Sequence, residues 1–197
     1  MHGLRGDAIR CRLADFAAVP PSEYFYELLY CLLTPQSSAV NAGRAVEILR
    51  ERNFRETPFD PEPVLSKKDH YIRFHRTKAA RLLKLRERFG EILPLLSDPR
   101  PGAELRSWLV RNVDGLGWKE ASHFLRNIGH RDLAILDRHI LTHLVSNGVI
   151  KKAPAALTEK KYLTIEKKFR AFSRRTGIAM DELDLLFWGL ETGMILK

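Results

Sequence analysis

Apolar residues recur every three or four positions along most of the chain, which is the spacing of an amphipathic helix. The first clear stretch follows Ser22 and places apolar residues at positions 24, 28, 29, 32 and 33 before Thr34-Pro35 ends it. A second stretch begins after Ser37 or Ser38, either of which can cap a helix. Strict alternation of apolar and polar residues, which would indicate strands, is hard to find.

The remaining helices are bounded by residues that cap or break helices. We expect helices over residues 77–89, 102–113, 118–128, 137–145 and 158–175, and a last one that starts at residue 181 and runs through residue 188. Gly90 and Gly129 stand where two of them should end, because glycine readily takes the left-handed conformation that closes a helix. A short separate segment is expected at 92–96. The predicted fold class is all-α, with roughly nine helices and no strand.

Composition agrees with a folded helical protein. Leucine, with 29 residues, outnumbers valine with 8 and isoleucine with 11, and this favours helices because β-branched residues favour strands. An apolar fraction of 45% rules out wholesale disorder. No apolar run approaches the roughly 18 to 20 residues of a membrane span, and the N-terminus lacks the apolar core of a signal peptide. We therefore expect a cytoplasmic protein without a membrane partner.

Residues that could hold a metal are few. Cys11 and Cys31 cannot form a disulfide framework, a zinc ribbon or a four-thiolate iron–sulfur cluster. His139 and His143 stand four residues apart, as two ligands on one helix can, yet no Glu follows His139 in an H-E-x-x-H motif and no third ligand is evident. A pair on the surface of a helix is the better interpretation. These residues do not predict a metal site.

The charge of the chain indicates a partner. Lys and Arg number 33 against 24 Asp and Glu, which gives a formal charge of +9. Nine basic residues and only two acids fall in each of the ranges 66–90 and 151–175. Such a surface attracts polyanions, and nucleic acids are the first to consider. Many basic proteins have no such partner, so charge alone leaves the question open.

The most informative stretch, residues 113–129, places a Gly-x-Gly turn between two amphipathic helices. Gly115 and Gly117 allow positive φ angles and close approach of another backbone. The helix that follows presents unpaired first-turn N–H groups and the positive end of its dipole, which together suit a phosphate. Both glycines are candidate DNA-binding residues, although a tight turn between helices would explain the same pattern.

Lys119 and Asp137 are the candidate catalytic residues. Lys119 lies in the first turn of the second helix, where the dipole disfavours a cation and favours the neutral amine. A neutral amine is the form that attacks carbon and builds a Schiff base. Asp137 stands between an apolar segment and a new helix, as an N-cap does. Its carboxylate could also face a developing positive charge on a sugar, or accept the proton of the lysine.

Gly115-Leu-Gly117-x-Lys119, followed by Leu136-Asp137-Arg-His, resembles the helix–hairpin–helix DNA glycosylase superfamily. The type-2 8-oxoguanine DNA glycosylase/lyases within it are similar over more of the chain. That similarity covers three further segments: Leu33-Thr-Pro-Gln-Ser37, Arg73-Phe74-His-Arg-Thr-Lys78, and the ending Trp188-Gly-Leu-Glu-Thr-Gly-Met-Ile-Leu-Lys197.

The resemblance implies two helical domains with a DNA-binding cleft between them. One domain would span residues 32–132 and contain the helical barrel with the helix–hairpin–helix motif. The other would be discontinuous, formed by residues 1–31 and 133–197. The partner would be double-stranded DNA containing 8-oxoguanine, bound by a monomer associated with the nucleoid, and no metal or redox cofactor is implied.

The resemblance also implies the chemistry. The family flips 8-oxoguanine out of the duplex, as an enzyme that works on a stacked base must. Lys119 would attack C1′, displace the base and leave a Schiff base through which β-elimination cuts the strand. Asp137 would activate the lysine and stabilise the oxocarbenium-like state. The predicted enzyme is a bifunctional DNA N-glycosylase and abasic-site lyase.

Four further residues are candidates for handling the flipped base and the gap it leaves. Phe74 and Trp188 resemble the aromatic pair that stacks on the base, although either could be a core residue. Gln36 resembles a position that fills the gap, and a polar helix-end residue explains it nearly as well. Lys197 matches the terminal lysine that helps distinguish 8-oxoguanine from guanine, and either its carboxylate or its ammonium could make the contact.

Two alternatives remain open at this point. The chain could be a glycosylase of the same superfamily for another damaged base, or a non-catalytic helix–hairpin–helix module that binds DNA. Such a module would need the hairpin and the positive charge, but not Lys119, Asp137 and Lys197 together.

Overall fold

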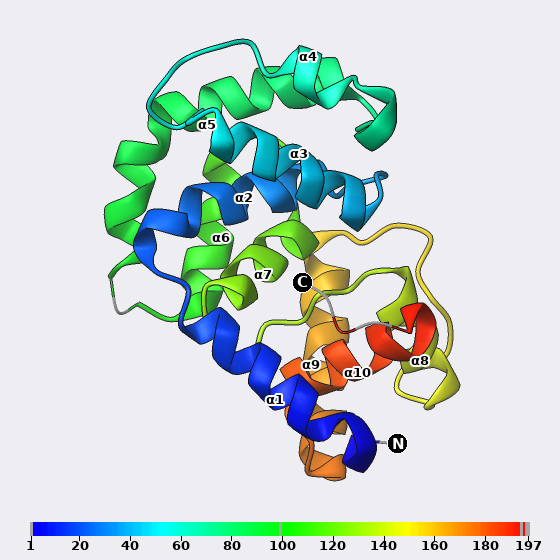
Figure 1. Cartoon of the computed structure of the whole chain (residues 1–197). Coiled ribbons are helices and arrows are strands. Elements are labelled where there is room, and N and C mark those ends of the chain that lie inside the picture. Colours follow the sequence, from blue (N-terminus) through cyan, green and yellow to red (C-terminus); the bar gives the residue numbers. More distant parts are fainter. Residues whose placement is uncertain (1, 99, 194, 196–197) are drawn as a thin grey trace. The chain divides into compact units, whose positions relative to one another are not determined.

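The structure, a computed structural model, describes residues 2–98, 100–193 and 195 of the chain. Ten α-helices and two short 3₁₀ helices, with no strand, make up these residues (Figure 1). The helices are α1 (His2–Ala17), η1 (Pro21–Glu23), α2 (Tyr24–Leu33), α3 (Ala39–Glu51), α4 (Glu62–Leu65), η2 (Lys68–His70), α5 (His75–Leu96), α6 (Gly102–Asn112), α7 (Trp118–Asn127), α8 (Arg138–Ser146), α9 (Glu159–Thr176) and α10 (Met180–Thr192). The all-α fold class predicted from the sequence is confirmed.

The chain folds into two compact units. Residues 20–124 form unit 2, and residues 1–19 together with 125–197 form unit 1. Within the described ranges, no helix is long and apolar enough to span a membrane.

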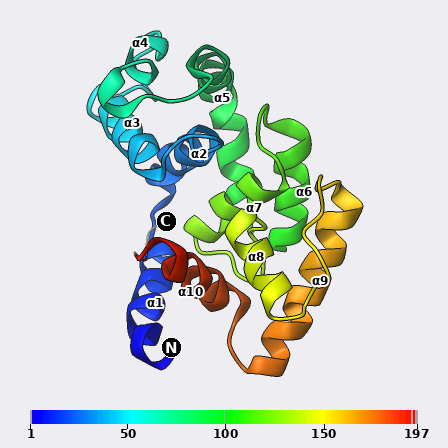
Figure 2. The same cartoon turned by 90° about the vertical axis from the view of Figure 1, so that its right-hand side faces the viewer.

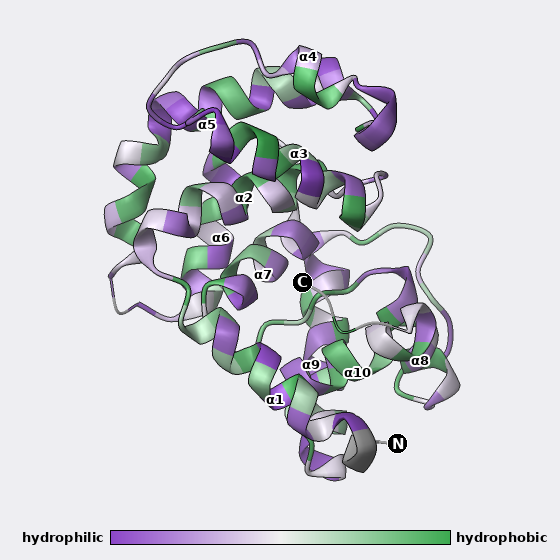
Figure 3. Cartoon of the chain, in the orientation of Figure 1, coloured by the Kyte–Doolittle hydropathy of each residue, from purple (hydrophilic) through white to green (hydrophobic). Residues whose placement is uncertain are grey.

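Unit 2 is built around α2, whose residues 25–33 are all buried. This helix packs on α3 and α5, and α4 packs on both α3 and α5. Phe25 contacts the rings of Phe54 and Phe89, at centroid distances of 6.2 and 5.1 Å. Bands of hydrophobic and hydrophilic residues alternate along α3 and α5 (Figure 3), as expected of helices that bury one face only.

Helix α5 departs from the sequence prediction. The expected helix ended at Gly90, with a separate segment at 92–96, but α5 continues without a break to Leu96. Its buried residues at positions 82, 85, 89, 92 and 96 keep one apolar face across the glycine, and packing of that face outweighs the low helix propensity of glycine. Pro94 lies in the last turn of α5, where it removes one intrahelical hydrogen-bond donor.

Unit 1 is organised around α10, which packs on α1, α8 and α9. Figures 1 and 2 show α1 and α10 side by side. The core between them consists of Ile9, Leu13 and Phe16 from α1 with Leu185 and Leu186 from α10, and Ile195 packs against this cluster. The segment after α10 therefore returns to the helical core at residue 195.

The compact units end at different residues from the predicted domains, whose boundaries lie after residues 31 and 132. The first difference arises because α2 packs on α3 and α5 and so belongs to unit 2. The second arises because residues 125–132 contact other parts of unit 1. Arg131 donates to the carbonyl of Leu13 over 2.8 Å, and a Cβ at Gly129 would lie 3.0 Å from the backbone of Ala17.

Candidate active site

The hairpin between α6 and α7 belongs to unit 2 and is closed by a tight turn. Leu116 N–H donates to the carbonyl of Val113 over 3.1 Å, and both side chains are buried. Gly115 has a φ of +87°, and a Cβ at this position would lie 2.6 Å from Cδ of Arg81. A side chain at position 115 would therefore meet both an unfavourable backbone conformation and an arginine that packs directly on the turn.

The two glycines of the turn differ in backbone conformation. Gly115 has a positive φ and Gly117 does not. Gly117 instead directly precedes α7, and its carbonyl accepts the N–H of Ala121 over 2.9 Å. A Cβ there would lie 2.8 Å from Oε2 of Glu120, the end of a flexible side chain. The requirement for glycine is thus stronger at position 115 than at position 117.

Lys119 is the second residue of α7, in the first turn, as predicted. Its Nζ lies 3.1 Å from Oε1 of Glu120, and the two side chains are 30% and 15% exposed. The neighbouring carboxylate offsets the unfavourable interaction of an ammonium with the helix dipole. The amine is reachable from solvent and has an adjacent group that can hold a proton.

Basic side chains of α5 flank the hairpin turn. Arg81, Lys84 and Arg88 line a cavity of about 270 Å³ together with residues 112–114 of the hairpin. Lys84 Nζ lies 2.8 Å from Oδ2 of Asp114, and this hydrogen bond and charge hold the pKa of Asp114 below its usual value. Glu87 also lines the cavity, so three basic side chains stand against two acidic ones, and the small excess of positive charge suits a phosphate group.

Gln36 and Phe74 also belong to unit 2, and both are exposed. Gln36 lies in the turn between α2 and α3 with a φ of +56°, and Phe74 directly precedes α5 with a φ of +60°. Ser37 Oγ accepts the backbone N–H of Arg73 over 3.0 Å. This bond joins the turn that carries Gln36 to the segment that carries Phe74.

Asp137 belongs to unit 1 and is the N-cap of α8. Its Oδ1 accepts the N–H of Ile140 over 2.8 Å, which confirms the capping role predicted from the sequence. Helix α9 holds the segment in front of it: Tyr162 donates its hydroxyl to the carbonyl of Ala134 over 2.5 Å and accepts the N–H of Leu136 over 3.3 Å. The carboxylate is thus oriented by its own helix, and the buried Tyr162 holds the backbone that precedes Asp137.

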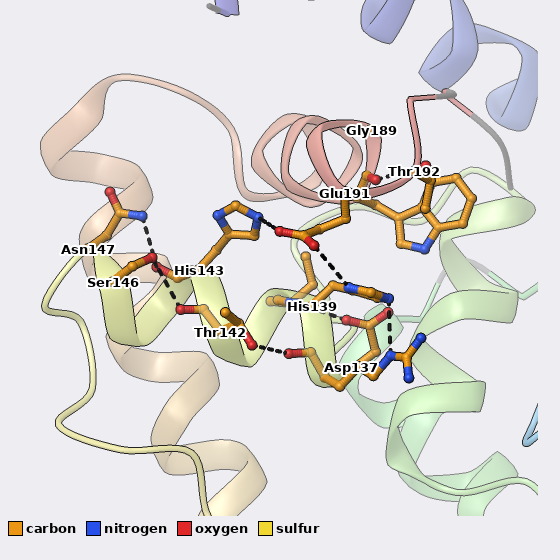
Figure 4. Close-up of polar contacts among 12 residues, drawn as sticks. Asp137, His139, Thr142, His143, Ser146, Asn147, Gly189, Glu191 and Thr192 are labelled. Atoms are coloured by element: carbon orange, nitrogen blue, oxygen red, sulfur yellow. Dashed lines mark hydrogen bonds and ion pairs between the residues drawn. The ribbon is translucent and has the colours of Figure 1, made fainter.

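The histidine pair of α8 does not lie free on a helix surface. Glu191 of α10 lies between the two rings, with Oε1 3.0 Å from Nε2 of His143 and Oε2 3.7 Å from Nδ1 of His139 (Figure 4). His143 also stacks on Phe187 at a centroid distance of 4.5 Å. The pair therefore connects α8, the helix that begins after Asp137, to the last turn of α10. Among the described residues, no group of three or more His, Cys, Asp or Glu could hold a metal ion.

Trp188 lies on α10 and is half-buried, one turn before Glu191. Thr192 donates its hydroxyl to the carbonyl of Trp188 over 2.9 Å, and Arg5 donates to the carbonyl of Gly189 over 2.7 Å. Lys197 lies outside the described residues.

Comparisons with known proteins identify the family of the chain. A model of the 8-oxoguanine DNA glycosylase family matches residues 9–178. The chain belongs to this family.

Its relatives match over most of their length. The 8-oxoguanine DNA glycosylase/AP lyase of Fusobacterium nucleatum is 43% identical over 177 residues, covering 87% of this chain and 81% of the relative. That of Korarchaeum cryptofilum is 41% identical over 175 residues, covering 89% and 83%. The crystal structure of the Methanocaldococcus jannaschii 8-oxoguanine glycosylase/lyase in complex with a 15mer DNA containing 8-oxoguanine has a TM-score of 0.87 to this chain at 36% identity, covering 98% of this chain and 93% of that one.

This glycosylase also carries a buried carboxyl whose charge interacts with Asp137. The pKa of Asp184 is raised to about 7, mainly by burial; Arg126 lowers it, and repulsion from Asp137 and Asp181 raises it. Arg126 NH1 lies 3.4 Å from Oδ2 of Asp184, and both side chains are at most 10% exposed. A carboxyl that titrates near neutral pH thus lies within electrostatic reach of Asp137.

Several residues next to the candidate site residues escaped the sequence analysis: Glu120, Tyr162, Asp184 and Lys78. Glu120 could have been found from its place beside Lys119. Tyr162 and Asp184 act across long stretches of sequence, so no local spacing points to them. Lys78 was quoted only as part of a family segment, and its burial is visible only in the fold.

Proposed function

We propose that this protein is a DNA repair enzyme that excises 8-oxoguanine from double-stranded DNA and cuts the strand at the resulting abasic site. The observation that carries the proposal is Lys119, which follows the Gly-x-Gly turn in the first turn of α7 in a chain of the 8-oxoguanine DNA glycosylase family. The enzyme acts as a monomer on chromosomal DNA, in the cytoplasm with the nucleoid. Sedimentation of the free protein tests the monomer.

Lys119 is the proposed nucleophile. Its neutral Nζ attacks C1′ of the flipped nucleotide, the bond from C1′ to the base breaks, and the base leaves with the bonding electrons and takes up a proton. The sugar ring opens as O4′ gains a proton, which leaves a protonated Schiff base between Nζ and C1′. Removal of a C2′ proton then expels the 3′ phosphate, and this β-elimination cuts the strand.

Asp137 is the proposed charge partner of that chemistry. Its carboxylate takes up the proton that Lys119 must lose and stabilises the positive charge that develops on the sugar. Oδ1 already accepts the cap hydrogen bond from Ile140, so the orientation of the carboxylate is set before substrate binds. The turn at Gly115, bordered by Arg81 and Lys84, is the proposed phosphate contact.

Recognition of the base is assigned to three residues by the family resemblance. Phe74 and Trp188 stack on the flipped ring, and such stacking contributes roughly 1–3 kcal/mol per base. Lys197 discriminates 8-oxoguanine from guanine, because 8-oxoguanine presents a donor at N7 and a carbonyl at C8 where guanine presents an acceptor at N7. Gln36 fills the gap left in the duplex.

Borohydride trapping tests the proposal. The protein is incubated with duplexes that carry 8-oxoguanine, oxidised pyrimidines or an abasic site, and borohydride reduces any Schiff base to a stable covalent complex. We expect trapping and strand cutting on 8-oxoguanine and abasic duplexes, and neither with Lys119→Gln, which should still bind DNA. A preference for another damaged base would support the first alternative, and absence of any covalent complex would support a non-catalytic binding module. Undiminished trapping by Lys119→Gln would contradict the assignment of the nucleophile.

A further inference from the structure

Two exposed residues of unit 2 have backbone conformations that their residue types rarely adopt. Gln36 has a φ of +56° and Phe74 has φ and ψ of +60° and +34°, both in the left-handed region. Asn53 and Asp132 have similar φ angles, but short polar side chains tolerate this conformation and glutamine and phenylalanine do not. Such residues persist only where their surroundings hold them, and they concentrate at functional sites.

A buried lysine holds the backbone on both sides of Gln36. Lys78 is 3% exposed, and its Nζ donates to the carbonyls of Leu33 and Pro35 over 2.7 Å each and to Ser37 Oγ over 3.3 Å. An ammonium has three N–H donors, so these acceptors use all of them. Burial, together with the charges of Arg81 and Lys119, lowers the pKa of Lys78 to about 8. The side chain has no donor left for a substrate.

The hydroxyl of Ser37 connects this turn to Phe74. Its Oγ accepts from Lys78 Nζ and from the N–H of Arg73, the residue before Phe74, which uses both of its acceptor sites. The N–H of Lys78 in turn donates to the carbonyl of Phe74 over 2.9 Å, the first hydrogen bond of α5. One lysine and one serine therefore fix the backbone next to both strained residues.

We propose that Lys78 and Ser37 are positioning residues that hold Gln36 and Phe74 in their left-handed conformations before DNA binds. The inference rests on the proposed function, in which those two side chains handle the flipped base and the gap it leaves. A backbone fixed in advance loses less conformational freedom on binding. Neither Lys78 nor Ser37 touches substrate, and both act through their neighbours.

The kinetic test uses Ser37→Ala, with Ser38→Ala as the matched control. Ser38 is the N-cap of α3, so its replacement costs stability without breaking a bond to Lys78 or Arg73. We expect Ser37→Ala to slow single-turnover excision of 8-oxoguanine about tenfold relative to Ser38→Ala. The reason is that Gln36 and Phe74 would no longer be held in alignment with the bound DNA. Trapping on a preformed abasic site should stay close to that of the control, and Ser37→Thr, which keeps the hydroxyl, should restore excision. Equal excision by Ser37→Ala and Ser38→Ala would overturn the inference.

A double-mutant cycle separates positioning from a general loss of stability. Gln36→Gly removes the side chain and lets the backbone adopt positive φ without support. If Ser37 acts through Gln36, the effect of Ser37→Ala on excision should shrink markedly in the Gln36→Gly background. Independent effects, which multiply in the double variant, would mean that Ser37 does not act through Gln36.

Limited trypsin digestion gives a measurement that does not require activity. Arg73 is exposed and its peptide bond to Phe74 lies inside the held segment. Cleavage after Arg73, identified by mass spectrometry, should be faster in Ser37→Ala and Lys78→Met than in Ser38→Ala. Unchanged cleavage would overturn the inference even in a protein that fails to excise 8-oxoguanine, whereas inactivity of the wild-type chain alone would count against the proposed function.

Discussion

At the scale of single residues, the carboxylate of Asp137 has a structural role as a helix cap and a proposed catalytic role. Its Oδ1 accepts the N–H of Ile140, and this bond depends on an oxygen acceptor but not on a charge. The proposed catalytic role depends on the charge. A substitution that keeps the oxygen and removes the charge therefore separates the two tasks.

Asp137→Asn should retain stability and lose activity. Asparagine caps helices about as well as aspartate, so the free energy of unfolding should change by less than about 0.5 kcal/mol. Loss of the proton acceptor and of the negative charge should lower the excision rate by about 10² to 10⁴. Chemical denaturation and single-turnover kinetics measure the two effects. Asp137→Ala serves as the comparison, since it removes the cap as well and should cost roughly 1 kcal/mol. A stable Asn variant with undiminished activity would leave Asp137 as a cap only.

Asp184 gives the stability of the enzyme a pH dependence. Its folded pKa of about 7 lies above the ordinary value of 3.8, so between those values the folded protein binds more protons than the unfolded chain. Stability should therefore fall as the pH rises through this window, by at most about 1.4 kcal/mol per pH unit from this one group. Asp181, whose pKa is also raised by burial, adds to the same trend.

Asp184→Asn should flatten that dependence. Urea unfolding at several pH values between 5 and 8 measures the slope for the variant and for the parent protein. Asp15→Asn is the control, because the Asp15 side chain on α1 is 65% exposed. A slope in the Asp184 variant that equals the parent slope would mean that this carboxyl does not titrate in the folded protein near neutral pH.

At the scale of elements, the hairpin turn depends on one glycine more than on the other. Gly115→Ala places a Cβ on backbone with a φ of +87° and 2.6 Å from Arg81 Cδ. The backbone conformation alone costs about 1–2 kcal/mol, and Arg81 must move as well. Gly148→Ala is a close control, since that residue also has positive φ but nothing lies within 4 Å of its Cβ.

We expect Gly115→Ala to lose more stability than Gly148→Ala and, unlike it, to bind DNA more weakly. The reason is that Arg81 and the turn both belong to the proposed phosphate contact. Thermal unfolding and titration of a labelled duplex measure the two effects. Equal losses of stability and of DNA affinity in both variants would show that the close packing of Arg81 on the turn contributes to neither.

The elements also show what the sequence could predict. A cap at Ser37 or Ser38, a cap at Asp137 and a helix start at residue 158 are local features, and the structure has N-caps at Ser38, Asp137 and Thr158. Gly90 misled the prediction because its local propensity is overridden by the apolar face of α5, which continues in packing contacts with other helices. Local spacing also identified Lys119 and its turn. The supports of the site, Tyr162 and Lys78, make hydrogen bonds to residues 26 to 45 positions away, and no sequence periodicity encodes such pairs.

At the scale of the whole molecule, positive charge is distributed over both units. The basic range 66–90 contributes Arg81, Lys84 and Arg88 beside the hairpin in unit 2. The basic range 151–175 contributes to unit 1 a cavity of about 590 Å³ lined by five lysines: Lys151, Lys152, Lys160, Lys161 and Lys168. Each set could contact phosphates. A basic residue that neutralises a phosphate makes the affinity for DNA depend more steeply on salt concentration.

The affinity for duplex DNA should fall linearly with salt on a double logarithmic scale, with a slope of about −0.9 for each neutralised phosphate. Removing a lysine that contacts a phosphate should reduce the magnitude of the slope by about 1, and removing a lysine that faces only solvent should leave it unchanged. Lys84→Gln and Lys160→Gln test one residue of each set by titration of a labelled duplex at several salt concentrations. We expect the slope to change for Lys84→Gln, because Lys84 borders the turn that is proposed to bind phosphate. A change for Lys160→Gln as well would extend the DNA contact to α9, while a flat salt response of the parent protein would contradict a binding mode dominated by phosphate contacts.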